Sequence, residues 1–328
     1  MKLLNSIFLI ISSQVLDIDL LIIDECLRID TGRDINDTGS LDESLLNKLS
    51  KEIVPKLDGT RKGEAGGIAV IGGSVAHPGP PFFAATSALK VGADFATVIT
   101  TENEASIIKS YSPELVVVPY TFMNSTPLYL DVVVIGPGLG KSPEALSLAY
   151  EMIKFCKENH KPLVIDAYGL YALSKNVAIL KDYPRPGAIL TPNAVEVNWL
   201  KQSVPESQEP WYKYWGSYVT VLQKGEKDMY FSSTGAFDWS LQGGGSGKRT
   251  GYQGDILAGA MGTFFHWGLK ANLCKGDKSS QLAQSVAAYA AAKITRTSNS
   301  KAFHEHGRSM IASDMLNEIH SAFDDLFS

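Results

Sequence analysis

Cysteine is scarce in this 328-residue chain, which has only Cys26, Cys156 and Cys274. The three are widely spaced and form neither a Cys-x-x-Cys pair nor the ligand spacing of a zinc site, so a disulfide scaffold and a structural zinc domain are not expected. The six histidines contain no His-Glu-x-x-His motif, which argues against a zinc hydrolase. So few cysteines favour a reducing compartment, and we expect a cytoplasmic protein.

An excess of positive charge is also missing. The chain has 30 Lys and Arg against 35 Asp and Glu, a formal net charge of -5. Nucleic-acid binding usually needs clustered Lys and Arg on one face, so no nucleic-acid partner is expected, and any anionic ligand must be bound by local groups. With 45% hydrophobic residues, the composition is that of a globular chain rather than a disordered one.

No apolar run is long enough to span a bilayer. The longest candidate, residues 3–16, has about 14 residues and is interrupted by asparagine and serine, so no membrane association is expected. It is either a targeting signal, with mitochondrial import as one option, or an extension that begins a buried helix. The first arginine is Arg28, later than a mitochondrial presequence would place it, so we favour the extension. We divide the chain into an N-terminal extension, 1–45, and one domain, 46–328.

Short runs of Val, Ile and Leu alternate with helical segments over the rest of the chain. Continuous apolar strands are typical of a parallel sheet that is covered on both faces. We therefore predict an α/β fold of three αβα layers with a mostly parallel central sheet. Strands are expected at 67–71, 95–100, 131–135, 162–166, 188–190, 220–225 and 228–233, and helices at about 82–91, 143–157, 255–270 and 281–296.

In such folds ligands bind where the strands end and loops enter the next helix. Glycines and polar residues follow several of the predicted strands at this point. They are Gly72–Ser74, Gly136–Gly140, Asp166, Thr191–Asn193 and Lys224–Glu226.

Two glycine-rich segments match known motifs only in part. Gly136 and Gly138 begin a dinucleotide fingerprint, but its third glycine would be Lys141, which disfavours hydride transfer. The segment 243–250, GGGSGKRT, lacks the first glycine and the final Ser or Thr of a P-loop. Neither motif is assigned.

The second segment still predicts an anion site. Its loop carries Lys248 and Arg249 and leads into a helix near Asp255. Backbone N–H groups at a helix start can bind an anion without a net positive protein. Asp255 itself has two interpretations, a helix cap or a catalytic base, and the spacing does not choose between them.

Several blocks, in order along residues 60–328, resemble the eukaryotic ATP-dependent NAD(P)H-hydrate dehydratases of the ribokinase-like superfamily. They include KGEAGGIAVIGGS, FFAATSALKVGADF, VVVIGPGLG, PLVIDA, ILTPN, VLQKGE and the QGD that ends at Asp255. The resemblance implies a ribokinase-like fold and a lyase that repairs hydrated NADH and NADPH. ATP would phosphorylate the ring hydroxyl and phosphate would then be eliminated, which leaves NAD(P)H, ADP and phosphate.

The resemblance also implies roles for individual residues. Asp255 would be the catalytic base, and Gly251 and Gly254 would belong to an anion hole around the transferred phosphoryl group. Asn193 and Glu196 would organise Mg²⁺ through water, although the same pair could cap a helix. Hydrated NAD(P)H would contact Gly138, Asn193, Ala194, Val195, Glu196, Val197, Asn198, Trp199 and Asp255. ATP would contact Lys224, Gly225, Glu226, Lys227, Asp228, Gly245, Ser246, Gly247, Lys248, Arg249, Thr250, Gly251, Tyr252, Gln253 and Gly254.

Some positions depart from the family pattern. Tyr168 replaces an aspartate, Tyr252 a glycine of the anion-hole loop, His77 a tyrosine and Ala194 a histidine. If position 252 needs a left-handed backbone, a tyrosine there costs about 1–2 kcal/mol. Two other functions are therefore retained as alternatives: a ribokinase-like kinase for a vitamin alcohol, and a nucleotide-binding pseudoenzyme. The partners are small molecules in every case, and a homo-oligomer is compatible with the sequence.

Overall fold

The computed structural model describes residues 41–328, except 126, 127, 209, 275 and 277. Expectations for the segment 1–40 lie outside these residues. The strands of the described part are β1 (Gly67–Ile71), β2 (Phe95–Thr100), β3 (Val116–Pro119), β4 (Val132–Ile135), β5 (Leu163–Ile165), β6 (Ala188–Leu190), β7 (Val219–Gln223), β8 (Lys227–Phe231) and β9 (Trp239–Gln242).

These strands form one sheet in the order β3-β2-β1-β4-β5-β6-β7-β8-β9. Strands β1 to β7 are parallel, whereas β8 runs antiparallel to β7 and β9 antiparallel to β8. The mostly parallel sheet is confirmed. The predicted limits of β1, β2 and β6 are those of the structure. The sequence did not predict β3, which ends in a proline, or β9, in which apolar and polar residues alternate.

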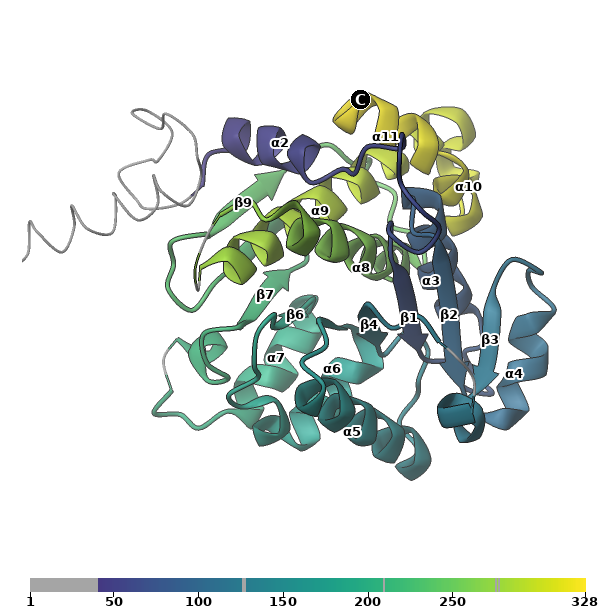
Figure 1. The fold of residues 1–328 in the computed structure, drawn as a ribbon, viewed down its shortest axis with the longest axis vertical. Helices are drawn as coiled ribbons and strands as arrows, with labels where there is room; N and C mark the ends of the chain where they lie inside the picture. The colour runs from purple at the N-terminus through teal and green to yellow at the C-terminus, as the bar shows by residue number, and fades with distance from the viewer. Residues whose placement is uncertain (1–40, 126–127, 209, 275, 277) are drawn as a thin grey trace, which may run out of the picture.

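Helices cover both faces of the sheet, as Figure 1 shows. One layer contains α2 (Glu43–Glu52), α3 (Gly79–Val91), α8 (Gln253–Ala271), α9 (Ser279–His306), α10 (Ala312–Asn317) and α11 (Ile319–Phe327). The other contains α5 (Pro143–Glu158), α6 (Ala167–Lys175) and α7 (Ala194–Ser203), while α4 (Glu102–Lys109) packs beside β3. The three-layer prediction is confirmed. None of the described helices is both long and apolar enough to cross a membrane.

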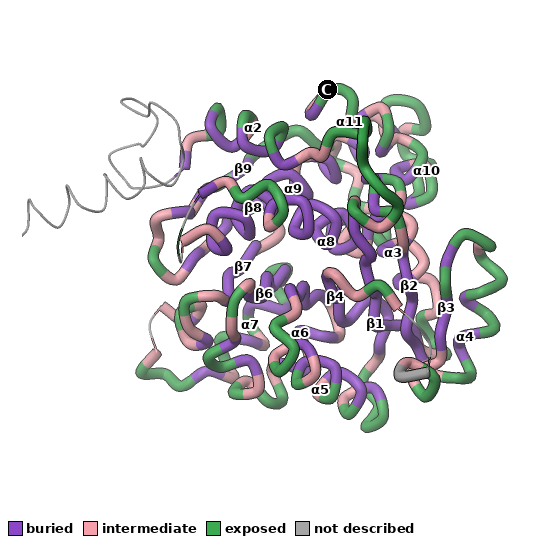
Figure 2. Tube along the Cα trace, viewed as in Figure 1, coloured by how far each residue is buried: buried purple, intermediate pink, exposed green. Residues whose placement is uncertain are grey.

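Burial follows from this arrangement. All five residues of β1 are buried, because helices cover the strand on both sides (Figure 2). Leu41 is buried as well, and α2 packs against α9, where Lys293 binds Glu43 at 2.6 Å. The domain boundary predicted at residue 46 therefore falls inside α2.

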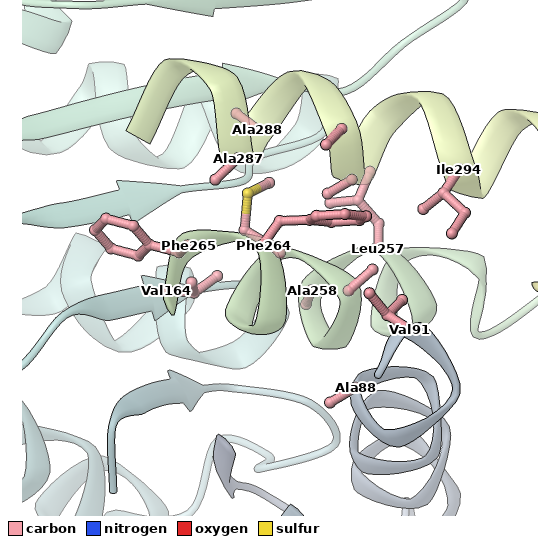
Figure 3. Close-up of a cluster of buried hydrophobic side chains, with 14 of the residues drawn as sticks. Ala88, Val91, Val164, Leu257, Ala258, Phe264, Phe265, Ala287, Ala288 and Ile294 are labelled. Atoms are coloured by element: carbon pink, nitrogen blue, oxygen red, sulfur yellow. The ribbon is translucent and has the colours of Figure 1, made fainter. Parts of the chain in front are cut away.

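Helix α8 is the centre of its layer. Phe264, Phe265 and Leu257 of α8 lie in one apolar cluster with residues of α3, α9 and β5 (Figure 3). Its Gly259 touches α3 so closely that an added Cβ would stand 1.9 Å from the carbonyl oxygen of Ala84. The small residue at this position sets the distance between α3 and α8, and so fixes where α8 begins relative to the sheet.

We expect Gly259→Ala to destabilise the protein by about 1–3 kcal/mol, because the added methyl forces α3 and α8 apart. This loss outweighs the gain of about 1 kcal/mol in helix propensity. Denaturant unfolding measures the change, with Lys270→Ala, at an exposed position of the same helix, as the control. Equal stability of Gly259→Ala and wild type would contradict the close packing of the two helices.

Candidate active site

Three strand ends meet at an ion pair. Asp166 follows β5 and Lys224 follows β7, and the Lys224 Nζ lies 2.5 Å from Asp166 Oδ1. Thr191, after β6, donates its hydroxyl to the same oxygen at 2.8 Å. The backbone N–H of Lys224 also donates to the carbonyl of Pro192 at 2.8 Å. The carboxyl ends of β5, β6 and β7 are thereby fixed relative to one another.

The charges of this cluster are unequal. The carboxyl groups of Asp166, Glu196 and Asp255 face one ammonium group, that of Lys224. Burial disfavours the charged form of Lys224, but Asp166 and Glu196 outweigh it and hold the pKa of Lys224 above its usual value. Burial also raises the pKa of Glu196, with Lys224 acting in the opposite direction. The site therefore favours an additional positive charge.

Asp255 lies in the first turn of α8. The helix begins at Gln253, so the residue in the N-cap position is Tyr252 and the interpretation of Asp255 as the cap is wrong. Burial, together with the charge of Asp166, raises the pKa of Asp255 to about 8, although Lys224 opposes the shift. A carboxyl group with a pKa near neutrality suits proton transfer.

Tyr252 has the left-handed backbone that the sequence suggested, with φ 66° and ψ 0°. This conformation costs a non-glycine residue about 1–2 kcal/mol. The ring of Tyr252 stacks on Phe83 of α3, with centroids 4.7 Å apart and planes 9° from parallel. An aromatic pair of this kind contributes about 0.5–1.5 kcal/mol, so the stack offsets much of the strain.

A first cavity, of about 520 Å³, lies beside the ion pair. It contains eight of the residues predicted to contact ATP: Lys224, Gly225, Glu226, Asp228, Arg249, Thr250, Gln253 and Gly254. Lys227, residues 245–248, Gly251 and Tyr252 do not line it. Asn193 and Ala194, which were predicted to contact the hydrate, line this cavity instead, next to the residues predicted for ATP.

Two polar residues of α9 hold the loops of the first cavity, and neither was predicted from the sequence. Arg296 binds Asp228 at 2.7 Å and donates to the carbonyl groups of Gly225, Glu226 and Gly243 at 3.1, 3.1 and 2.9 Å. Asn299 accepts from the backbone N–H of Ser246 at 2.7 Å and donates to the carbonyl of Lys248 at 3.1 Å.

Asp228 is therefore committed to shaping the turn, since its other oxygen accepts from Gly225 N–H at 2.9 Å. The sequence did hold a clue to these two residues, because Arg296 and Asn299 stand among small residues in a stretch that forms a helix. The helix was predicted to end at residue 296, however, and it continues to His306.

A second cavity, of about 650 Å³, lies between the glycine loops that follow β1 and β4. The loops touch closely: a Cβ on Gly138 would stand 2.4 Å from the carbonyl oxygen of His77, and Ser74 donates its hydroxyl to the carbonyl of Gly138 at 2.8 Å. His77 and Tyr168, two departures from the family pattern, meet in the wall with ring centroids 5.7 Å apart. The lining comprises residues 73–77, 101, 103, 104, 139–142, 144, 145 and 168.

The remaining predicted residues belong to α7 and the turn before it. Asn193 accepts from the backbone N–H groups of Val195 and Glu196, and Glu196 accepts from Asn193 N–H at 2.8 Å, so the predicted helix cap is confirmed. Val195 and Asn198 are exposed, and Val197 is buried in the core. Trp199 packs edge-on against Tyr171, with Lys141 over both rings, which connects it to the second cavity.

The chain is similar to several curated proteins named ATP-dependent (S)-NAD(P)H-hydrate dehydratase. It is 42% identical to one from Aedes aegypti, covering 88% of this chain and 87% of that protein, and 38% identical to one from Homo sapiens, covering 85% and 84%. The family model described as NAD(P)H-hydrate dehydratase matches residues 68–321.

Solved structures show the same fold. A ribokinase-like superfamily protein of Enterococcus faecalis has a TM-score of 0.67 at 20% identity, covering 90% of this chain and 99% of that one. The ADP/ATP-dependent NAD(P)H-hydrate dehydratase of Bacillus subtilis, co-crystallised with ATP and Mg²⁺, has a TM-score of 0.59 at 21% identity, covering 84% and 97%. On the identities and the family match together, this chain belongs to the NAD(P)H-hydrate dehydratase family.

Proposed function

We propose that this protein dehydrates hydrated NADH and NADPH at the expense of ATP. The observation that carries the proposal is the position of Asp255, whose raised pKa arises beside the Asp166–Lys224 pair and the first cavity. Asp166 also connects this region with the second cavity, because Gly136 of the β4 loop lies against its carbonyl oxygen and Tyr168 lines that cavity. We assign ATP to the first cavity and the hydrated nicotinamide to the second.

The chemistry begins as phosphoryl transfer. The carboxylate of Asp255 takes the proton of the ring hydroxyl, whose oxygen attacks the γ-phosphorus while the bond to the β-phosphate oxygen breaks. ADP leaves. The ring carbon–oxygen bond then breaks with its electrons on the departing phosphate, and the adjacent ring carbon loses a proton, which restores the double bond of NAD(P)H.

The start of α8 stabilises the charge that develops. The backbone N–H groups of residues 251–254, at the start of the helix, would donate to the transferred phosphoryl group. A Cβ on Gly254 would lie 3.3 Å from Lys224 Nζ, a tight contact that would press on the ammonium group. Without that side chain the ammonium group of Lys224 stays accessible to the phosphates.

Mg²⁺ fits this site as an ion held mostly by ATP and water. Among the described residues no group of three or more His, Cys, Asp or Glu could hold a metal by itself. Mg²⁺ usually combines one or two carboxylates with phosphate oxygens and waters. Glu196 and, through water, Asn193 would hold it, and its charge would offset that of the three carboxylates. When bound, it would neutralise charge on the phosphates.

The proposal is tested by incubating the protein with ATP, Mg²⁺ and NADH hydrate, which should restore the absorbance of NADH. Asp255→Asn should lower kcat by about a hundredfold or more, since the group that accepts the proton is lost. Asp325→Asn, on α11, is the control and should keep full activity. A stable phosphorylated hydrate would instead identify a kinase, and ATP binding without turnover a pseudoenzyme.

The pH profile follows from the raised pKa of Asp255. Only its carboxylate accepts a proton, so kcat/KM should rise with pH up to about 8. Stability should change in the opposite direction. The folded pKa lies above the unfolded value, so this contribution is fully present below about pH 4 and is lost as pH rises through about 8. Melting temperatures should therefore be measured for wild type and Asp255→Asn across this pH range. As the pH rises from about 4 to about 8, the melting temperature of wild type should fall more than that of the variant, which lacks the titrating carboxyl group.

Arg296→Met should raise the KM for ATP, because the turns at 225–228 and 243 lose the side chain that joins them. It should also destabilise the fold by about 3–5 kcal/mol, since the carboxylate of Asp228 stays buried without its partner. The double variant with Asp228→Asn should regain part of the stability but keep the raised KM. Arg308→Met, at an exposed position, is the control, and an unchanged KM for ATP in the stable double variant would argue against this role.

A further inference from the structure

The second cavity must accept an anion if it binds the hydrated dinucleotide. NADH hydrate carries a pyrophosphate, and NADPH hydrate carries a 2′-phosphate in addition. Of the described residues that line this cavity, Lys141 is the only lysine or arginine. Because the chain has a formal net charge of -5 and offers no general positive field, a phosphate in this region depends on a local cation.

Lys141 is held in place by aromatic rings. Its Nζ lies 4.7 Å from the centroid of the Tyr171 ring and 5.6 Å from that of Trp199. The Nζ of Lys175 lies 5.1 Å from the same Tyr171 centroid. Neither lysine forms an ion pair with a carboxylate in the part of the chain that the structure describes. A ring face attracts an ammonium group without neutralising it, so two positive charges remain beside one tyrosine.

The carboxylates of the second cavity do not offset this charge. Glu104 and Glu144 both line the cavity, and Glu104 is buried. Hydrogen bonds from its own backbone N–H and from Ser142 lower the pKa of the Glu144 carboxyl. Glu144 is thereby engaged at the start of α5 rather than with Lys141, and the ammonium group of Lys141 stays available to a ligand.

Helix α6 connects the two lysines to the second cavity. Tyr168, Tyr171 and Lys175 follow one another at spacings of three and four residues, which places them on one face of this helix. Tyr168 lines the cavity, and Lys175 is the last residue of the helix. The helix rises by about 10 Å between them. A ligand that extends from the cavity along this face would therefore meet Lys141 and then Lys175.

We propose that Lys141 and Lys175 bind a phosphate group of the hydrated dinucleotide at the edge of the second cavity. The inference rests on the proposed function and names the residues that would select a phosphorylated substrate. Lysine suits this role, since its ammonium group is a compact charge that binds phosphate from several directions. The phosphate is either the pyrophosphate, which both hydrates contain, or the 2′-phosphate, which only NADPH hydrate contains.

The test removes each charge with Lys141→Met and Lys175→Met, which keep most of the aliphatic side chain. Each should raise the KM for the hydrate about fivefold, and the double variant about tenfold or more, the size expected for exposed charge pairs. Neither lysine lines the first cavity, so kcat, the KM for ATP and the melting temperature should stay unchanged. Lys141→Arg keeps the charge and should behave nearly as wild type.

Lys181→Met is the matched control. Lys181 also lies over an aromatic ring, 5.8 Å from the centroid of Tyr214, but it does not line the second cavity. The variant removes the same charge from the same kind of contact, and the KM for the hydrate should stay at the wild-type value.

Two substrates identify the phosphate. A rise in KM that is confined to NADPH hydrate assigns the lysines to the 2′-phosphate, whereas an equal rise with NADH hydrate assigns them to the pyrophosphate. With either phosphate, raising the ionic strength should narrow the difference between wild type and the double variant, because salt screens exposed charges.

A direct binding measurement keeps this inference separate from the proposed function. Calorimetry with each hydrate and no ATP should show weaker binding to the double variant than to wild type. Binding that depends on the two lysines without any turnover would overturn the proposed activity but support the phosphate site. Turnover with affinities of the double variant within twofold of wild type for both hydrates, or an equal loss of affinity in Lys181→Met, would overturn the phosphate site and leave the proposed activity standing.

Discussion

The buried ion pair between Lys224 and Asp166 is the constraint on which the site depends. It joins the ends of β5 and β7, and Thr191, which directly follows the strand between them, donates to the same carboxylate oxygen. With only one ammonium group among three carboxyl groups, the proton of Asp255 is retained to about pH 8. The arrangement that fixes the strands thus also raises the pKa of the carboxyl group proposed as the base. A bound cation, together with Lys224, would offset the negative charge of the carboxylates and of the ATP phosphates.

The two helical layers contribute differently to function. Helices α8 and α9 of one layer form part of the first cavity. The N-terminal turn of α8 lines it, and Arg296 and Asn299 of α9 hydrogen-bond to its loops. The second cavity is built from loops, from the start of α4 and from the start of α5.

Local costs accumulate around the proposed site. Tyr252 adopts a left-handed backbone and recovers stability by stacking on Phe83. His77 and Tyr168 both depart from the family pattern, yet they contact each other in the wall of one cavity. Substitutions that look independent along the chain are therefore neighbours in space, so their effects on activity should be coupled.

The sequence by itself determined the layered fold, because continuous apolar strands and intervening helices require a parallel sheet with both faces covered. It also pointed to the loops after β5, β6 and β7, since strand ends in such a sheet share one edge. Tertiary structure alone decided the rest. Arg296 and Asn299 carry no local motif, and their importance arises from turns that are distant in sequence. The raised pKa of Asp255 likewise comes from burial and from Asp166, which lies 89 positions earlier in the chain, and no local pattern records either effect.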